Sequence, residues 1–387
     1  MTRVLLRTLA ALVLLAATGL IAWRVLAPAE VLSSATTPYP PESLRSAGVT
    51  GRTSMAPLIV DGRLRVYGAK HQVKADAPVD GRTLYTARWS FRRWPEQLSG
   101  LTASGPTVIS RWSDGELVAL DARTGKIFWR TDGPAAPRYA GHRTGAAAVW
   151  DPPGLHLAAG TVVVHEGQKL MGYDVSTGQT RWTRSTPPAC DAGFTTSGGA
   201  FVCGGDGGAY AGRTGDVLTG YPSGPVTPIG CESEMSDCAG LRTDAGQGWL
   251  ADSLVPVRTP ALDAPTATVA AGVIVSAGDG SVRAFSDDGT PLWTWAGAAR
   301  ILGGSGPIIV LLTGDNTLVG LDAQRGTVRY SFPFRFDEKD SLEWKPGRYR
   351  ISGGYLAVER LRVDANDDPE SPTYYLTLDA VIIAAVR

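Results

Sequence analysis

Short apolar runs rich in β-branched residues recur along the chain and are separated by turn-forming residues. Examples are TVVV (161–164), GVIVSA (272–277) and PIIVLL (307–312), each closed by Gly, Asp or Asn. Runs of this length between turn residues predict β-strands joined as hairpins. After residue 30 no stretch shows the spacing of an amphipathic helix. The pattern therefore predicts an all-β chain.

A longer pattern repeats across these strands: an Asp, a Gly four residues later and an aromatic residue four residues after that. Three copies keep this spacing: Asp121, Gly125 and Trp129; Asp174, Gly178 and Trp182; Asp322, Gly326 and Tyr330. Two weaker copies keep Gly289 with Trp293, where the acid moves to Asp287, and Thr214 with Gly215. A repeated supersecondary unit of about 35–50 residues indicates a propeller or a solenoid.

The spacing between copies predicts one more unit. The repeat Gly residues lie 53, 37, 74 and 37 residues apart, and 74 is twice 37. We therefore expect a degenerate copy between Gly215 and Gly289.

Each recurring position of the repeat has a structural explanation. The Asp at the end of a strand can accept hydrogen bonds from backbone N–H groups two or three residues later, and the Gly supplies the positive φ that the turn needs. The Trp then opens the outermost strand and packs between neighbouring sheets. These residues are therefore expected to build the fold and not to carry chemistry.

The L-D-x-x-T-G-x-x-x-W pattern resembles the PQQ-like, quinoprotein-type β-propeller repeat, which quinoprotein dehydrogenases share with scaffold propellers of the bacterial cell envelope. The resemblance covers most of residues 50–387 and implies a single closed β-propeller of four-stranded blades. Adding the hidden copy, an N-terminal unit that closes at LYTARWSF (84–91) and a C-terminal unit from RYRISGGYLAVERL (348–361) gives eight blades. Seven is the alternative, in which the first and last units share one sheet.

The N-terminus departs from the all-β pattern. Arg3 and Arg7 precede an apolar run over residues 8–23, which predicts a hydrophobic helix. The run is slightly short for a membrane span, usually about 17–25 residues, but residues 25–27 can extend it past a snorkelling Arg24. We favour a retained anchor, and a cleaved signal peptide is the alternative. Both alternatives place the rest of the chain outside the cytoplasm.

These patterns divide the chain into three parts. Residues 1–27 are the predicted signal-anchor or transmembrane helix. Residues 28–50 are rich in Pro, Ser, Thr and Ala and predict a semi-extended linker that holds the ring off the membrane. Residues 51–387 are the predicted propeller.

Charge narrows the range of partners. The chain has 37 basic and 37 acidic residues, so its formal net charge is zero. Because nucleic-acid binders carry a basic surface, this balance argues against a nucleic-acid partner.

The cysteines are few and lie close together in sequence: Cys190, Cys203, Cys231 and Cys238. None shows the C-x-x-C spacing of a zinc site, and an even number in an exported chain predicts two disulfides. The preferred hypothesis pairs Cys190 with Cys203 and Cys231 with Cys238. The crossed pairing remains open, because the sequence does not fix connectivity.

The segment between the last two cysteines, ESEMSD, is acidic and lacks β-forming residues. If its disulfide forms, we expect Glu232, Glu234 and Asp237 to be displayed on a fixed acidic loop at the rim of the propeller. The alternative is an insertion that the fold merely tolerates.

Candidate chemistry is sparse. The resemblance implies that a quinoprotein dehydrogenase would stack its quinone between a Trp and a disulfide of adjacent cysteines, with Ca²⁺ and a catalytic Asp. This chain has no adjacent cysteines, so no catalytic residue is carried over. The acidic stretch 363–372 lacks the EF-hand pattern and predicts a hairpin loop. The four histidines are scattered singly and predict loop or surface positions.

The sequence thus favours a non-enzymatic, membrane-tethered propeller on the extracytoplasmic side, without a cofactor or metal. It would bind a protein, a peptide or an envelope ligand on its rim or over its channel. The alternatives are a PQQ-dependent quinoprotein oxidoreductase and a ligand-sensing domain.

Overall fold

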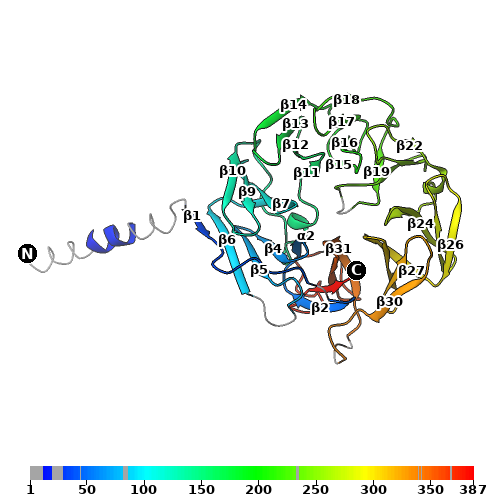
Figure 1. Cartoon of the computed structure of the whole chain (residues 1–387). Coiled ribbons are helices and arrows are strands. Elements are labelled where there is room, and N and C mark those ends of the chain that lie inside the picture. The colour runs from blue at the N-terminus through cyan, green and yellow to red at the C-terminus, as the bar shows by residue number, and fades with distance from the viewer. Residues whose placement is uncertain are drawn as a thin grey trace, which may run out of the picture.

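The computed structural model describes residues 12–19, 29–43, 45–81, 86–231, 235–338, 340, 342–366 and 368–387. Within these ranges the chain forms eight β-sheets arranged as blades in a ring around a central channel (Figure 1). The predicted all-β propeller is therefore confirmed, with eight blades.

Seven blades contain four consecutive antiparallel strands, the first nearest the channel (Figure 1), and blade 1 has a fifth strand in addition. Their strands are, in blade 1, β3 (Pro57–Val60), β4 (Leu64–Ala69), β5 (Gln72–Ala77) and β6 (Thr86–Trp94); in blade 2, β7 (Leu98–Ser104), β8 (Thr107–Trp112), β9 (Leu117–Asp121) and β10 (Ile127–Thr131); in blade 3, β11 (Leu155–Ala158), β12 (Thr161–Glu166), β13 (Lys169–Asp174) and β14 (Thr180–Ser185); in blade 4, β15 (Gly193–Thr195), β16 (Ala200–Cys203), β17 (Ala209–Ala211) and β18 (Val217–Leu218); in blade 5, β19 (Val226–Ile229), β20 (Gly240–Thr243), β21 (Gly248–Leu250) and β22 (Val257–Arg258); in blade 6, β23 (Ala267–Ala270), β24 (Val273–Gly278), β25 (Ser281–Phe285) and β26 (Pro291–Ala296); in blade 7, β27 (Ala299–Ser305), β28 (Ile308–Thr313), β29 (Thr317–Asp322) and β30 (Val328–Pro333).

Blade 5 is the degenerate copy that the spacing predicts. It lies between Gly215 and Gly289, and its connection between β21 and β22 contains no Gly, unlike the turns of the other copies. The fold thus retains the repeat where the sequence motif has faded.

The eighth blade closes the ring by combining both ends of the chain. It contains β31 (Lys345–Ser352), β32 (Tyr355–Leu361), β33 (Val381–Ala385) and, as its outer strand, β2 (Gly48–Thr53). Strand β2 pairs antiparallel with the fully buried β33. Closure removes the free ends that an open array of blades would leave. The first and last units do share a sheet, but in a ring of eight blades.

The predicted linker over 28–50 is partly a strand. Strand β1 (Ala29–Ser33) pairs antiparallel with β6 and becomes the fifth strand of blade 1. Its Glu30 lies between two arginines and forms ion pairs with Arg93 and Arg130. The expectation of a linker is therefore wrong for β1, because strand pairing and these ion pairs hold it on the ring.

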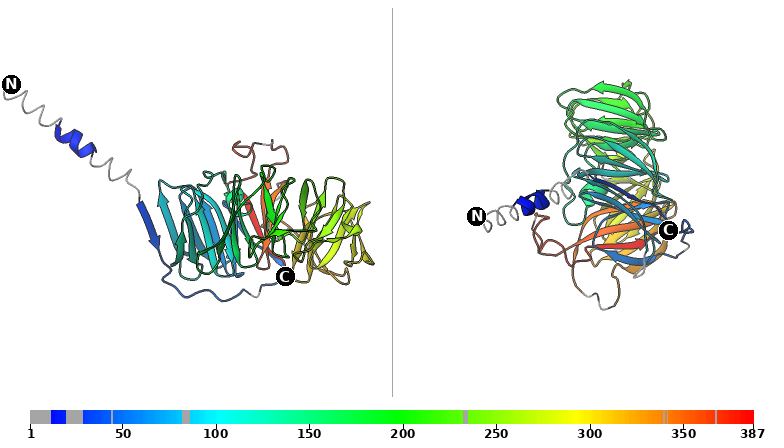
Figure 2. Two further views of the ribbon diagram at one scale, coloured as in Figure 1. Left: turned by 90° about the horizontal axis from the view of Figure 1, so that it is seen from above. Right: turned by 90° about the vertical axis from the view of Figure 1, so that its left-hand side faces the viewer.

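Residues 34–43 and 45–47, here called the strap, continue from β1 along one face of the ring toward the C-terminus (Figure 2). The Ala35 N–H donates to the Thr124 carbonyl at 2.9 Å, and the Tyr39 hydroxyl donates to Asp61 at 3.0 Å. Near the end of the strap, Arg45 pairs with Asp80 at 2.7 Å. The strap is thus bound to the ring along its length and is not a free spacer.

Only part of the predicted anchor over residues 8–23 is described. Residues 12–19 are helical and exposed, whereas residues 1–11 and 20–28 lie outside the described residues. Among the helices described, none combines the length and apolar character needed to cross a bilayer. The assignment of residues 1–27 as an anchor stays a prediction.

Four tryptophans on outer strands connect consecutive blades, and we call these contacts the tryptophan seams. In each seam a Cβ added to the turn Gly of the next blade would lie 2.5–2.6 Å from the Trp side chain. The indole N–H also donates to the carbonyl three residues before that Gly, at 2.7–3.0 Å. The pairs are Trp89 with Gly125, Trp129 with Gly178, Trp182 with Gly215, and Trp293 with Gly326.

The seams explain why Gly is needed at this position. Gly178, for example, has φ +71° and also has no space for a side chain beside Trp129. The preceding Asp174 accepts hydrogen bonds from the N–H groups of Ser176 and Thr177 at 2.9 and 3.0 Å, which fixes the turn. Asp121 and Asp322 accept equivalent bonds. In blade 7, Tyr330 takes the place of the Trp and packs into the core beside blade 8.

Candidate functional site in the central channel

The connection between β19 and β20 folds into the channel. Its described residues 235–238 lie beside β15, the inner strand of blade 4. The Thr195 N–H donates to the Met235 carbonyl at 3.0 Å, and the Cys238 N–H donates back to the Thr195 carbonyl at 2.8 Å. The Ser197 N–H then donates to the Cys238 carbonyl at 3.0 Å. These bonds add a short parallel segment to the channel edge of blade 4.

This placement corrects the expectation of an acidic loop at the rim. Asp237 lines the channel, because the backbone bonds to β15 turn the segment inward. Glu232 and Glu234 lie outside the described residues.

Both predicted disulfides form. The Cys231–Cys238 bond closes the channel segment, with Cys231 on the cavity wall and Cys238 buried. The Cys190–Cys203 bond is buried between blades 3 and 4, away from the cavity. The first disulfide therefore fixes a channel-lining segment, and the second stabilises a seam between blades.

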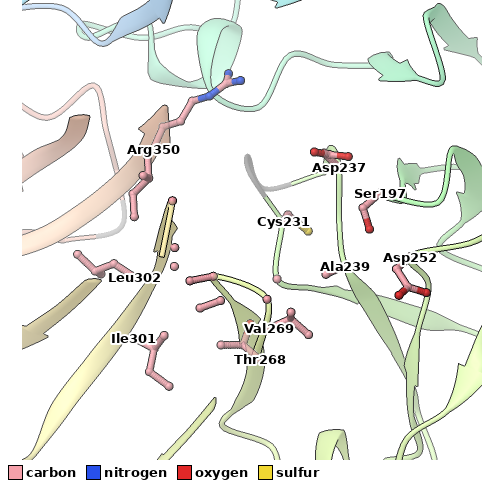
Figure 3. A pocket seen from close by; sticks show the side chains of 18 of the residues that line it. Ser197, Cys231, Asp237, Ala239, Asp252, Thr268, Val269, Ile301, Leu302 and Arg350 are labelled. Carbon is pink, nitrogen blue, oxygen red and sulfur yellow. The ribbon is translucent and has the colours of Figure 1, made fainter. Parts of the chain in front are cut away.

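The channel contains a cavity of about 590 Å³ between the inner strands of blades 5 to 8 (Figure 3). A second cavity of about 270 Å³ extends toward blades 2 to 4. Ser197, Asp237 and Arg350 line both, so the two cavities meet beside the disulfide segment. The larger volume lies within the range typical of ligand sites, about 300–1,000 Å³.

The two sides of the cavity carry opposite charge. Asp237 and Asp252 lie on the side of blade 5, and Arg350 lies across from them on β31 (Figure 3). Arg300 joins Arg350 on this basic side, with its guanidinium 5.2 Å from the centre of the Tyr349 ring. We call these surfaces the acidic wall (Asp237, Asp252) and the basic wall (Arg300, Arg350).

Local structure positions the charged groups. Arg350 donates from Nη1 to the carbonyl of Val149, at 3.2 Å, in the short helix α2 (Ala146–Val149). Asp237 has φ +55°, an uncommon conformation for a residue other than Gly, which the disulfide segment maintains. Burial in the channel raises the pKa of Asp237 above its ordinary value. A cationic ligand group beside it would favour the charged carboxylate.

Two histidines depart from the expected loop or surface positions. His156 and His165 are only 4% and 6% exposed, and both rings lie 5.5 Å from the ring of Phe201. They are buried because β11 and β12 direct them into the interface between blades 3 and 4. Burial lowers the pKa of His156 to about 4 and also lowers that of His165.

The acidic stretch 363–372 lies in the connection between β32 and β33, as the hairpin expectation requires. There Asp364 pairs with Arg362, and Glu370 pairs with His142. Across the described part of the chain, no group of three or more His, Cys, Asp and Glu side chains is placed to hold a metal ion.

The cavity does not fit the quinone that the family resemblance implies. That arrangement needs a disulfide of adjacent cysteines and a stacking Trp, whereas Cys231 and Cys238 are seven residues apart. Among the described residues that line either cavity, none is a Trp. We derive no redox chemistry from this site.

Sequence reasoning missed this site. It identified Asp237 but gave no reason to group it with Asp252, Arg300 or Arg350. These residues come from blades 5, 7 and 8, and only ring closure brings them to one cavity. No local motif marks them.

Comparison with known proteins supports the fold. A family model described as outer membrane protein assembly factor BamB matches residues 11–195, a little under half of the chain. No curated protein matches the sequence.

The solved structures that match the chain share little sequence with it. The crystal structure of BamB from Moraxella catarrhalis is 13% identical with a TM-score of 0.44, over 92% of this chain and 99% of that one. The computationally designed Ika8 protein is 13% identical with a TM-score of 0.47, over 88% and 99%. A europium-containing methanol dehydrogenase is 13% identical with a TM-score of 0.44, over 89% and 93%.

Proposed function

Because the chain is a β-propeller built from PQQ-like repeats, we propose that it is a non-enzymatic binding scaffold of the cell envelope that holds a protein or peptide partner at its central channel. The match to an assembly-factor family model supports a role in holding other proteins. The membrane tether, the partner and the extracytoplasmic location are parts of this proposal.

One observation carries the proposal: a disulfide-fixed segment inside the channel, beside a cavity with an acidic and a basic wall. Fixing a loop before binding reduces the entropy that a partner must remove. Charges on opposite walls select a partner of matching charge and orient it. These features suit recognition of another chain.

The proposed location rests on the disulfides and on the N-terminal charges. Disulfides persist in oxidising compartments outside the cytoplasm. Arg3 and Arg7 precede the apolar run, and positive charge of this kind stays on the cytoplasmic side. The propeller would then lie on the extracytoplasmic side, tethered by residues 1–27.

Site-specific photo-crosslinking in native envelopes tests the scaffold. A benzophenone amino acid replaces Ser197 in the channel or, as the control, Val217, which is 69% exposed on the outer strand β18. We expect a protein adduct from position 197 and none from position 217. An adduct from 217 alone would keep a scaffold but move its surface outward, and no adduct from either position would overturn the proposal.

The disulfide segment has its own test. Replacing Cys231 and Cys238 together with Ser should leave thermal unfolding nearly unchanged but weaken partner capture, because the channel segment loses its fixed shape. The matched control replaces Cys190 and Cys203, whose disulfide lies away from the cavity. If capture survives loss of the Cys231–Cys238 bond, the segment is only a tolerated insertion.

The tether and the absence of turnover are tested separately. A retained anchor should fractionate with membranes and keep its N-terminal peptide, whereas a mature N-terminus near Glu30 would show a cleaved signal.

Purified protein supplied with PQQ, Ca²⁺ and alcohols or sugars should reduce a dye no faster than the quinone alone. Saturable turnover would contradict the non-enzymatic assignment.

A further inference from the structure

We propose that the channel binds an extended peptide of a partner protein as an added strand on the inner edge of β27, with its acidic side chains on the basic wall and its basic side chains on the acidic wall. This inference rests on the proposed scaffold function and specifies its ligand. An extended segment with alternating charge is the predicted class of ligand.

The protein itself shows that an inner edge of this ring can pair with an extended segment. Residues 235–238 lie along β15 and exchange three backbone hydrogen bonds with Thr195 and Ser197. Strand addition of this kind supplies affinity from the main chain and leaves specificity to the side chains. Blade 4 thus uses the pairing that we propose for blade 7.

Strand β27 offers a longer edge to the cavity than the inner strands of blades 5 and 6. It has seven residues, whereas β19 and β23 have four each. In its sheet β27 is the terminal strand and pairs with β28 alone. Over the described ranges, no other segment makes a backbone hydrogen bond to residues 299–305. Its channel edge therefore has donors and acceptors for an added strand.

Two glycines keep part of this edge accessible. Gly303, Gly304 and Gly306 line the cavity. A Cβ at Gly306 would meet nothing within 4 Å, and one at Gly303 would meet only the tip of Ile351 at 3.5 Å. Gly304 differs, because a Cβ there would lie 2.3 Å from the backbone nitrogen of Ala271. A wall without side chains lets another backbone approach closely. The cavity of about 590 Å³ provides the volume for that segment.

The charged walls set the side-chain pattern. An added strand projects successive side chains toward opposite faces of its sheet. For β27 one face looks toward blade 8, where Arg350 lies and where Arg300 contacts Tyr349. The other face looks toward blades 5 and 6, where Asp237 and Asp252 lie (Figure 3). Acidic and basic residues should therefore alternate along the peptide.

Two peptides of identical composition test this pattern on the detergent-solubilised full chain. The alternating probe is acetyl-GEKEKEKEKG-amide, which places all acids on one face of a strand. The control is acetyl-GEEKKEEKKG-amide, which mixes the charges on both faces. By isothermal titration calorimetry at low salt, we expect the alternating probe to bind at least about tenfold more tightly. Equal affinities, or no binding of either probe, would overturn the inference.

Variants locate the binding. Ser197→Trp should block the channel and abolish binding, whereas Thr294→Trp, which adds the same bulk at an exposed position of β26, should leave it unchanged. Arg350→Gln should weaken the binding of the alternating probe several-fold. Asp237→Asn, which is nearly isosteric, should do the same without disturbing the segment. Unchanged binding to Ser197→Trp would contradict a channel site.

The outcomes separate this inference from the scaffold proposal. If position 197 crosslinks a partner but neither peptide binds, the scaffold stands and the added strand is wrong. If the peptides bind but no partner crosslinks in native envelopes, the channel recognises strands and the scaffold proposal fails.

Discussion

The tryptophan seams and blade 5 solve the same packing problem differently. Seams such as that between Trp129 and Gly178 repeat one contact between neighbouring blades. Blade 5 has no tryptophan of this kind on β22, and its four strands have only four, four, three and two residues. Yet this blade supplies the disulfide segment and the acidic wall. The irregular blade 5 thus contributes the acidic side of the candidate site, and blades 7 and 8 contribute the basic side.

An arginine takes over the contact between blades 5 and 6. Arg242 donates from Nη2 to the carbonyls of Leu262, Ala264 and Ala267 at 2.8–2.9 Å. Its Nε adds a bond to the Leu262 carbonyl at 3.0 Å. Burial lowers the pKa of Arg242, although the nearby Asp263 opposes the shift. Directed hydrogen bonds thus replace the stacked ring.

The largest expected effect comes from deleting a seam. Trp129→Ala should lower the free energy of unfolding by about 3–5 kcal/mol, because it removes a buried ring and leaves a cavity between two blades. Phe128→Ala, at a neighbouring residue that is 54% exposed, should change it by no more than about 0.5 kcal/mol. Denaturant midpoints measure both. Similar losses for the two variants would show that the tryptophan is not special.

These seams also show what the sequence can predict. The spacing of Asp, Gly and Trp predicts the propeller, because each blade repeats one local turn. The motif does not show which blade receives each ring, and it does not mark Trp89 as a member of the set. No Gly stands four residues before Trp89, yet its indole N–H makes the same bond to the next blade.

The pH dependence of stability tests the region where the Trp182 seam approaches the disulfide segment. His156 is buried there, near the backbone of Met235, with a folded-state pKa of about 4. Its unfolded pKa is near 6.5, so the unfolded chain binds more protons between these values. The free energy of unfolding should therefore fall by up to about 3 kcal/mol as the pH drops from 6.5 to 4.

Histidine variants assign this slope. His156→Gln should reduce the dependence between pH 6.5 and 4 and leave the contribution of His165, whose pKa burial also lowers, whereas the exposed His142→Gln should leave the dependence intact. Carboxylates such as Asp174, whose pKa its hydrogen bonds hold well below the ordinary range, add their losses at lower pH. If His156→Gln does not change the pH dependence of the free energy of unfolding, that dependence comes from other groups.

The arginine seam should be somewhat weaker than a tryptophan seam. Arg242→Met keeps an apolar stem but removes the donors, and it should cost about 2–3 kcal/mol because partly buried carbonyls lose a charged partner. Arg213→Met, at an exposed position, is the control and should be neutral. Chemical unfolding compares the two variants. A neutral Arg242→Met would mean that other contacts hold blades 5 and 6 together.

The smallest effect separates two roles of glycine. Gly178 and Gly167 both have positive φ, +71° and +55°, so Ala strains the backbone at either position. Only at Gly178 would the new Cβ overlap Trp129, whereas Gly167 faces open space. Gly178→Ala should therefore cost about 1–2 kcal/mol more than Gly167→Ala in the same unfolding assay. Equal losses would show that the repeat Gly is needed only for the positive φ of its turn and not for the contact with the Trp.

The candidate site shows where sequence reasoning ends. Asp237 stands out within an acidic segment, but its direction depends on backbone bonds to β15, about forty residues earlier in the chain. Arg300 and Arg350 belong to ordinary strand sequences, and nothing local distinguishes them from surface arginines. Their meeting depends on the closed circle of blades, which is a property of the whole chain.

The order of β1, the strap and β2 determines how the ring would respond to a pulling force on its N-terminus. Tension applied before Ala29 must first peel β1 from β6 and then release the strap contacts, such as that between Arg45 and Asp80. Only afterwards would the load reach β2, the strand that closes the ring against β33. The N-terminal segment therefore bears the load first and protects the pairing of β2 with β33 from mechanical unfolding.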